Sequence, residues 1–407
     1  MEKKKKILSD SIWSIVGLVL MNVSLQFAVY PFWERISGEA ALGNILYLIS
    51  LMNVFAVSMG VSVNYARLKK SADSETKNLP YLSILGASTA VCVILALLIS
   101  FFGGVQMSVA ERVIFVLVMC ATMWRYYADV EYKMSLNYKR YFLYYLFISI
   151  GYGVGIALFA VTGLWPLTLL VGEAFGLAFV LFTGKIFKAD EPMERGDLGD
   201  ALKLVMILLG SEMLSTLIFN ADKILLKTVI DEIAVTDFYL ASLLGKTIAL
   251  LTAPLTGVII GYLSKYKGEF TPRIMNISVV VAALMVVLAT AACTVGSYIL
   301  IPILYPNQFA DVKEYFITAN LSQVVFFVGS VMTVVLLRFA KSKYQMYITA
   351  IYAAAFAAVC IPFAMKWGLS GFCIGLVITC LARFLITVFL GYFSAIKNIR
   401  NKKHCEE

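Results

Sequence analysis

A long apolar stretch with one charge near its centre decides the fold. Residues Leu369 to Ala395 read LSGFCIGLVITCLARFLITVFLGYFSA, and Arg383 is the only charged residue among them. A helix needs about 20 apolar residues to cross the hydrocarbon core of a bilayer, so this stretch is long enough to span a membrane. Because an unpaired charge at the bilayer centre costs roughly 2.5 to 3.5 kcal/mol on insertion scales, we expect Arg383 to have a partner or a function.

Stretches of this kind continue along the whole chain. The protein has 407 residues, of which 61% are hydrophobic, and its loops are too short for a soluble catalytic domain. The closest pair of stretches is separated only by Gly163 and the Trp165-Pro166 pair, where Pro166 fits the first turn of a new helix. The predicted fold class is an all-α polytopic membrane protein. Its twelve predicted spans are residues 9–32, 43–65, 81–102, 109–131, 142–162, 164–184, 201–221, 236–263, 274–304, 315–337, 344–365 and 369–395.

Basic residues are concentrated in alternate loops and at both ends of the chain. By the positive-inside rule, such loops face the cytoplasm, so we predict a multi-pass protein of the plasma (inner) membrane with both termini cytoplasmic. The net charge of +9 is spread over separate patches, which favours contact with membrane lipid head groups and argues against nucleic acid. The basic segments are 3–6, 67–77, 133–140, 185–203, 265–273, 338–343 and 397–403.

The chain shows signs of an internal duplication. Residues Tyr47 to Met52 read YLISLM and residues Tyr239 to Leu244 read YLASLL, and both segments open the second span of a predicted six-span set. Many transporters are built from repeated halves with the substrate site between them. We therefore predict an N-terminal six-helix bundle at 1–190, a cytoplasmic linker at 191–200, and a C-terminal six-helix bundle with a cytoplasmic tail at 201–407.

Two segments resemble a known family. Residues 36–43 read ISGEAALG and precede Tyr47, and this arrangement resembles the start of the polysaccharide flippases, the O-antigen and teichoic-acid exporters of the MATE-like superfamily. Residues 220–226 read NADKILL, and together with Tyr239 and Pro254 they are similar to that family's seventh and eighth spans. The resemblance implies a MATE-like fold of two six-helix bundles around a central cavity. It also implies a lipid-linked oligosaccharide as cargo and glycan-synthesis enzymes as partners.

Two cations near span centres lie on helix faces made of small and polar residues. Such faces meet other helices or water rather than lipid tails. Lys246 and Arg383 can therefore line a cationic cavity for an anionic head group such as pyrophosphate, which Arg binds bidentately and Lys as a point charge. The alternative is a structural ion pair of either cation with Glu212 or Glu173. The face of Lys246 comprises Tyr239, Ser242, Ala249, Ala253 and Gly257, and that of Arg383 comprises Gly375, Thr379, Thr387 and Gly391.

Arg125 is a third candidate cation for the substrate. Asp129 follows it by one helical turn, so an i,i+4 pair is the structural alternative. In the first span, Asn22 and Gln26 share a face with Tyr30. This face can hydrogen-bond sugar hydroxyls or simply pack between helices.

Two carboxylates near span centres are candidates for ion coupling. Glu173 and Glu212 fall one in each predicted half. Desolvation favours the protonated form of such a carboxylate, so that it can gain and release protons. Gly172 and Gly176 flank Glu173 and predict close helix packing around it, whereas pairing with Lys246 or Arg383 would keep either carboxylate ionised.

The sequence offers no sign of catalytic or metal chemistry. The single histidine, His404, lies in the C-terminal tail, so neither a histidine metal site nor a Ser-His-Asp triad can be assembled in the membrane. We predict no cofactor, no metal and no enzymatic activity. The predicted function is a flippase that moves lipid-linked oligosaccharide by alternating access. The alternatives are a small-molecule or multidrug antiporter of the same fold, a membrane-embedded glycan polymerase, and a non-transporting assembly partner.

Overall fold

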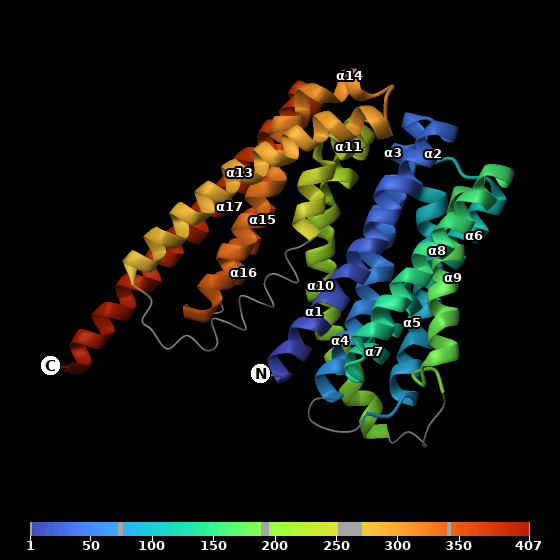
Figure 1. The fold of residues 1–407 in the computed structure, drawn as a ribbon, viewed down its shortest axis with the longest axis horizontal. Coiled ribbons are helices and arrows are strands. Elements are labelled where there is room, and N and C mark those ends of the chain that lie inside the picture. The colour runs from blue at the N-terminus through green and yellow to red at the C-terminus, as the bar shows by residue number, and fades with distance from the viewer. Residues whose placement is uncertain (1, 72–75, 189–194, 251–270, 340–342, 407) are drawn as a thin grey trace. The chain divides into compact units, whose positions relative to one another are not determined.

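The structure, a computed structural model, is mostly helical in the residues that it describes. These are residues 2–71, 76–188, 195–250, 271–339 and 343–406, and they contain no β-strand (Figure 1). Ten helical segments within these ranges are long and apolar enough to cross a membrane. Two features account for the difference from the twelve predicted spans. The predicted span 236–263 lies partly in α11 (Glu232–Leu250) and partly in residues outside the described ranges. The single segment Tyr347–Ile396 covers the last two predicted spans. The predicted polytopic all-α fold is confirmed, and the described helices are consistent with about twelve spans.

The chain forms two compact units, Met1–Ile224 and Leu225–Glu407. The boundary falls inside α10 (Arg195–Val229), which begins within the predicted linker. Residues 191–194 of that linker lie outside the described residues. The division into six-helix bundles at residues 1–190 and 201–407 stays a prediction.

The N-terminal unit is a bundle in which α8 packs against α1 and α9, and α6 packs against α4, α5 and α9. Two π-helical segments, η1 and η2, interrupt its first two spans, and such segments are frequent at functional sites. The elements of this unit are α1 (Glu2–Val23), η1 (Ser24–Val29), α2 (Tyr30–Ser37), α3 (Glu39–Met52), η2 (Asn53–Val57), α4 (Ser58–Ser71), α5 (Leu79–Phe102), α6 (Val109–Ala128), α7 (Val130–Met134), α8 (Tyr138–Thr162), α9 (Trp165–Thr183) and α10 as far as Ile224.

Local sequence sets several helix ends in this unit. Ser108 and Glu111 form a capping box at the start of α6, with hydrogen bonds of 2.8 and 3.2 Å. Gly163 ends α8 with a φ of 71°, a left-handed conformation that glycine adopts without strain, and Pro166 stands in the first turn of α9. The predicted separation of the fifth and sixth spans is confirmed.

In the C-terminal unit, α15 packs against α11, α13 and α17. Trp367 and Gly368 have non-helical backbone angles, with φ of 58° at Gly368, and they separate the last two predicted spans within α17. The described elements of this unit are the end of α10, α11 (Glu232–Leu250), α13 (Pro272–Leu304), α14 (Phe309–Val312), η3 (Lys313–Tyr315), α15 (Phe316–Phe339), α16 (Lys343–Ala355), η4 (Phe356–Cys360) and α17 (Ile361–Glu406). Its core includes Met275, Cys293, Val324, Phe327, Val328 and Met332.

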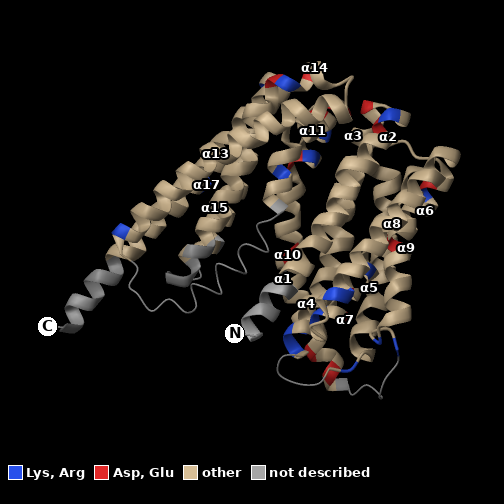
Figure 2. Cartoon of the chain, in the orientation of Figure 1, with Lys and Arg blue, Asp and Glu red and all other residues tan. Residues whose placement is uncertain are grey.

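Charged residues lie mostly near the ends of the helices, and long stretches between the ends carry none (Figure 2). This distribution is expected when the middle of each helix contacts lipid or other helices, because an isolated charge there is costly. The few charges placed within these stretches therefore define the regions where a site can lie.

Candidate functional site

A buried ion pair joins α6 to α9 in the N-terminal unit. The Arg125 Nε donates a hydrogen bond to Glu173 Oε2, and the two side chains are only 4% and 3% exposed. Thr122 Oγ1 donates to the other carboxylate oxygen at 3.4 Å. The Arg125 guanidinium also lies over the Tyr126 ring, with its carbon 3.8 Å from the ring centroid. The predicted pairing of Arg125 with Asp129 is wrong, because Glu173, 48 residues further along the chain, takes its place.

Close helix packing surrounds the carboxylate of this pair. A Cβ at Gly172 would lie 2.1 Å from the Tyr152 ring, and a Cβ at Gly176 would lie 2.7 Å from the Ile148 side chain. The predicted close packing around Glu173 is confirmed. The ion-pair partner of Glu173 within the N-terminal unit is Arg125.

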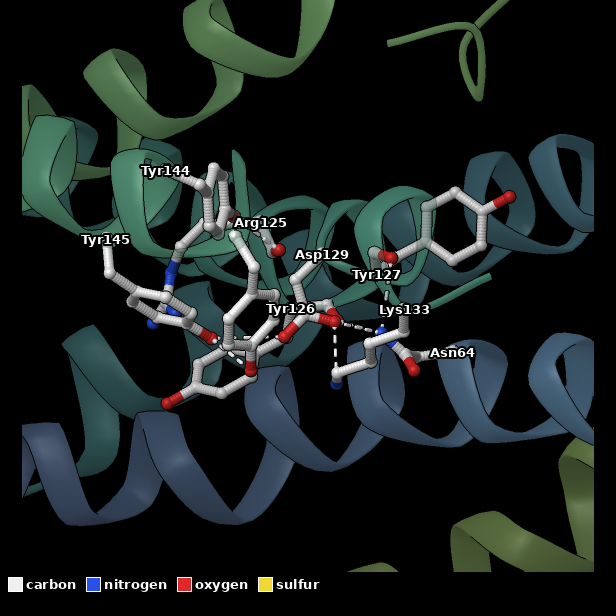
Figure 3. A network of polar contacts seen from close by, with 9 residues as sticks. Asn64, Arg125, Tyr126, Tyr127, Asp129, Lys133, Tyr144 and Tyr145 are labelled. Atoms are coloured by element: carbon white, nitrogen blue, oxygen red, sulfur yellow. Dashed lines mark hydrogen bonds and ion pairs between the residues drawn. The ribbon is translucent and has the colours of Figure 1, made fainter. Parts of the chain in front are cut away.

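Asp129, which is buried, forms a second ion pair with the half-buried Lys133 at the break between α6 and α7 (Figure 3). Lys133 Nζ lies 2.8 Å from Asp129 Oδ1, and Tyr145 OH donates to Oδ2 at 3.0 Å. Asn64 Nδ2 donates to Asp129 Oδ1 and also to the Tyr126 carbonyl at 2.9 Å. Asp129 therefore connects α4, α7 and α8 at one point.

The two pairs form one electrically balanced network. Arg125 is neutralised by Glu173 and Lys133 by Asp129, and Tyr144 OH donates to the Arg125 carbonyl at 2.8 Å. Buried charges are tolerated when they are paired and hydrogen-bonded. This network holds helices of the N-terminal unit together and presents no net charge to a ligand.

Arg383 in the C-terminal unit has a different environment. Its Nη1 donates to the Phe326 carbonyl at 3.3 Å. The guanidinium carbon lies 4.3 Å from the Phe326 ring centroid and 5.4 Å from that of Tyr352, within cation–π range. Among the described residues, no carboxylate lies within 4.0 Å of a guanidinium nitrogen of Arg383.

Several residues on the helix faces around the C-terminal cations are buried, which agrees with faces that meet other helices. Lys246 is 8% exposed, and its neighbours on the same face of α11, Tyr239, Ser242 and Ala249, are also buried. Thr379 and Thr387, which share a face with Arg383, are each 1% exposed. Ala253, Pro254 and Gly257, which the sequence placed after Lys246, lie outside the described residues.

Glu212 lies half-buried on α10. Within the described ranges, no Lys or Arg nitrogen lies within 4.0 Å of its carboxylate. Its backbone carbonyl accepts a hydrogen bond from Thr216 Oγ1 at 2.7 Å, and that hydroxyl accepts one from Ser58 at 3.1 Å. Glu212 and Glu173 therefore differ: Glu173 has a cationic partner and Glu212 is without one in the described part of the chain.

The predicted polar face of the first span coincides with the first π-helical segment. Asn22, near the end of α1, donates from Nδ2 to the Leu18 carbonyl of its own helix at 2.8 Å. Gln26 lies in η1 and is half-buried. Their role in substrate binding stays a prediction.

The sequence reasoning missed the uncharged members of these sites. Asn64 and Asn320 lie within predicted apolar spans and are 1% and 0% exposed. An amide within an apolar stretch is a usable signal, because a buried amide requires partners. No sequence signal linked Arg125 to Glu173, since their contact depends on how α6 packs on α9.

Comparison with solved structures identifies the fold. No protein-family model and no curated protein matches the sequence. An inward-facing multidrug resistance MATE family transporter of the MOP superfamily aligns over 95% of this chain and 99% of its own, with a TM-score of 0.64 and 15% identity. The lipid II flippase MurJ in an inward closed conformation aligns over 96% and 91%, with a TM-score of 0.68 and 13% identity. The chain therefore has a MATE-like fold, as predicted.

Proposed function

We propose that this protein is a membrane transporter that flips a lipid-linked oligosaccharide by alternating access, with Arg383 binding the anionic head group. The observation that carries this proposal is the absence of a carboxylate beside Arg383 in the described part of the chain. A cation kept within an apolar helix without a carboxylate has charge available for a ligand.

The geometry around Arg383 suits an anion. One of the five guanidinium N–H groups is used by the Phe326 carbonyl, and the Phe326 and Tyr352 rings lie against the guanidinium. Donors held in this way match the oxygens of phosphate or pyrophosphate, which Arg binds bidentately. Lys246 on α11 would add a second cation as a point charge. Arg125 is less suited, because Glu173 already neutralises it.

The choice between cargo classes rests on charge. The fold is found both in a multidrug transporter and in a lipid II flippase, and a fold alone does not set the substrate. A site for a drug cation should place an uncompensated carboxylate beside aromatic rings, whereas the aromatic rings of Phe326 and Tyr352 lie against the cation Arg383. We therefore favour an anionic lipid-linked head group over a lipophilic cation.

Energy coupling is proposed at Glu212. A coupling ion acts only through its different affinity for the two conformational states. A carboxylate without a cationic partner can exchange a proton or sodium ion, whereas ion exchange at Glu173 would break its bond to Arg125. We assign coupling to Glu212 for this reason.

A reconstituted system tests the cargo. Purified protein in vesicles is given a fluorescent sugar linked to a polyprenyl pyrophosphate, and its movement between leaflets is measured. We expect Arg383→Gln to abolish this movement and Arg383→Lys to retain part of it, because charge is kept while the planar fork is lost. Lys246→Arg should also retain partial function.

A matched control uses Arg112, which lies near the start of α6 with its guanidinium carbon 4.4 Å from the Phe101 ring centroid. Arg112→Gln removes a ring-stacked arginine outside the proposed site and should leave movement unchanged. Full activity of Arg383→Gln, or vesicles that transport a lipophilic cation but no polyprenyl-linked sugar, would contradict the proposal and support the antiporter.

A further inference from the structure

Asn320 on α15 makes an unusual set of contacts with the backbone of α11. Its Oδ1 accepts a hydrogen bond from the Gly245 N–H at 2.8 Å, and its Nδ2 donates to the Ala241 carbonyl at 3.1 Å. The same Nδ2 lies 3.1 Å from Ser297 Oγ on α13 and 2.8 Å from the Phe316 carbonyl. Asn320 is fully buried, so these contacts are protected from solvent.

The two α11 groups that Asn320 contacts are normally partners of each other. In an α-helix the N–H of residue i bonds to the carbonyl of residue i−4, which for Gly245 is Ala241. The Asn320 carboxamide therefore bonds both the N–H and the carbonyl of one i to i−4 pair of α11, which we call the rung between Ala241 and Gly245. α11 stays α-helical across this rung, so the carboxamide binds the helix from its side and ties this turn of α11 to α15.

The absence of a side chain at position 245 makes this contact possible. A Cβ on Gly245 would lie 2.9 Å from the Gln323 Cβ and 3.0 Å from Asn320 Oδ1. The next residue along α11 is Lys246, which is 8% exposed. Asn320 therefore holds the turn of α11 that directly precedes Lys246.

We propose that Asn320 is a positioning residue that fixes the turn of α11 at Gly245 against α15 and thereby places Lys246 for the anionic head group. This inference rests on the proposed function for the role of Lys246. The structural part of the inference, that Asn320 fixes α11, does not depend on which molecule is transported.

The first experiment measures the position of residue 246 without using transport. In a variant depleted of native cysteines, Lys246→Cys is introduced and its rate of reaction with a small thiol reagent is recorded. Adding Asn320→Leu removes the carboxamide, while the Gly245 N–H and the Ala241 carbonyl can still partner each other within the helix. We expect a several-fold change in the reaction rate. An unchanged rate would overturn the proposal.

Ser322 supplies the matched control. It is buried on the same helix, and its hydroxyl donates to the Ala319 carbonyl of that helix at 2.7 Å. Ser322→Ala removes a buried polar group from α15 and only a hydrogen bond within that helix, so the reaction rate at position 246 should not change.

The second experiment connects position to transport. With native Lys246, Asn320→Leu should lower the maximal rate of movement of the polyprenyl-pyrophosphate-linked sugar by up to about 100-fold, since a displacement of about 1 Å can cost that much. Ser322→Ala should keep the rate. A shifted residue 246 with unchanged movement would keep the positioning role and remove Lys246 from the proposed function.

Two further variants test the same contact if Asn320→Leu does not fold. Asn320→Asp keeps the acceptor for the Gly245 N–H and loses the Nδ2 donor, and Gly245→Ala displaces the carboxamide through its Cβ. Each should change the reaction rate at position 246, and an unchanged rate in a folded variant counts against the proposal as above.

Discussion

The charged residues within the spans fall into two kinds of environment. Arg125 and Glu173 neutralise each other and are almost fully buried, so neither charge is available to a ligand. Arg383 lies against two aromatic rings and has no carboxylate within 4.0 Å among the described residues. The partner of each charge, rather than its depth in the apolar stretch, separates Arg125, which is neutralised, from Arg383, which we propose binds the head group.

The Arg125–Glu173 pair leads to a prediction about stability. Removing one member leaves the other buried without compensation, which costs on the order of 3–5 kcal/mol. We expect Arg125→Gln and Glu173→Gln each to lower the thermal unfolding midpoint of the purified protein strongly. The double variant should recover most of the loss, because no uncompensated charge remains. A double variant as unstable as the sum of the single variants would contradict a direct pair.

Glu212 leads to a prediction about coupling. Its carboxylate has no cationic partner within 4.0 Å in the described part of the chain. We expect Glu212→Gln to abolish the dependence of transport on a proton or sodium gradient while substrate binding is retained. The measurement compares movement in vesicles with and without each gradient. Gradient-driven movement that survives in Glu212→Gln would exclude this residue, and Glu173→Gln should show the smaller effect on coupling.

At the scale of elements, glycines set how closely the helices approach. A Cβ on Gly60 of α4 would lie 2.3 Å from the Met123 carbonyl of α6. A Cβ on Gly155 of α8 would lie 2.6 Å from the Thr168 Cα of α9. Small residues at helix interfaces allow backbones to approach in this way in membranes. The contact of α4 with α6 in turn brings Asn64 to Asp129.

This packing predicts a difference between two glycines in helices. Gly60→Ala forces α4 away from α6, because the obstacle is a backbone carbonyl that cannot rotate aside. We expect a clear fall in the unfolding midpoint. A Cβ on Gly86 of α5 would meet no atom within 4 Å among the described residues, so Gly86→Ala should leave stability unchanged or raise it. Equal effects of the two substitutions would show that α4 and α6 do not pack as described.

At the scale of the whole molecule, the sequence predicts the elements better than their contacts. Apolar length located the spans, and Gly163 with Pro166 marked the turn between α8 and α9, because these signals are local. The partner of Arg125 could not be predicted, since Glu173 reaches it only through the packing of α6 on α9. Asn320 was overlooked because a search for charge passes over an amide, although its contacts with α11 are among the most specific in the C-terminal unit.

The orientation in the membrane gives the last prediction. Basic loops alternate along the chain, which places both termini in the cytoplasm by the positive-inside rule. Asn307, between α13 and α14, and Gly196, at the start of α10, are both exposed and belong to loops of opposite predicted side. A cysteine at position 307 should react with an impermeant thiol reagent added outside intact cells, and one at position 196 should react only after the membrane is opened. The reverse pattern would invert the predicted orientation, with both termini outside, and would reverse the assignment of which loops face the cytoplasm.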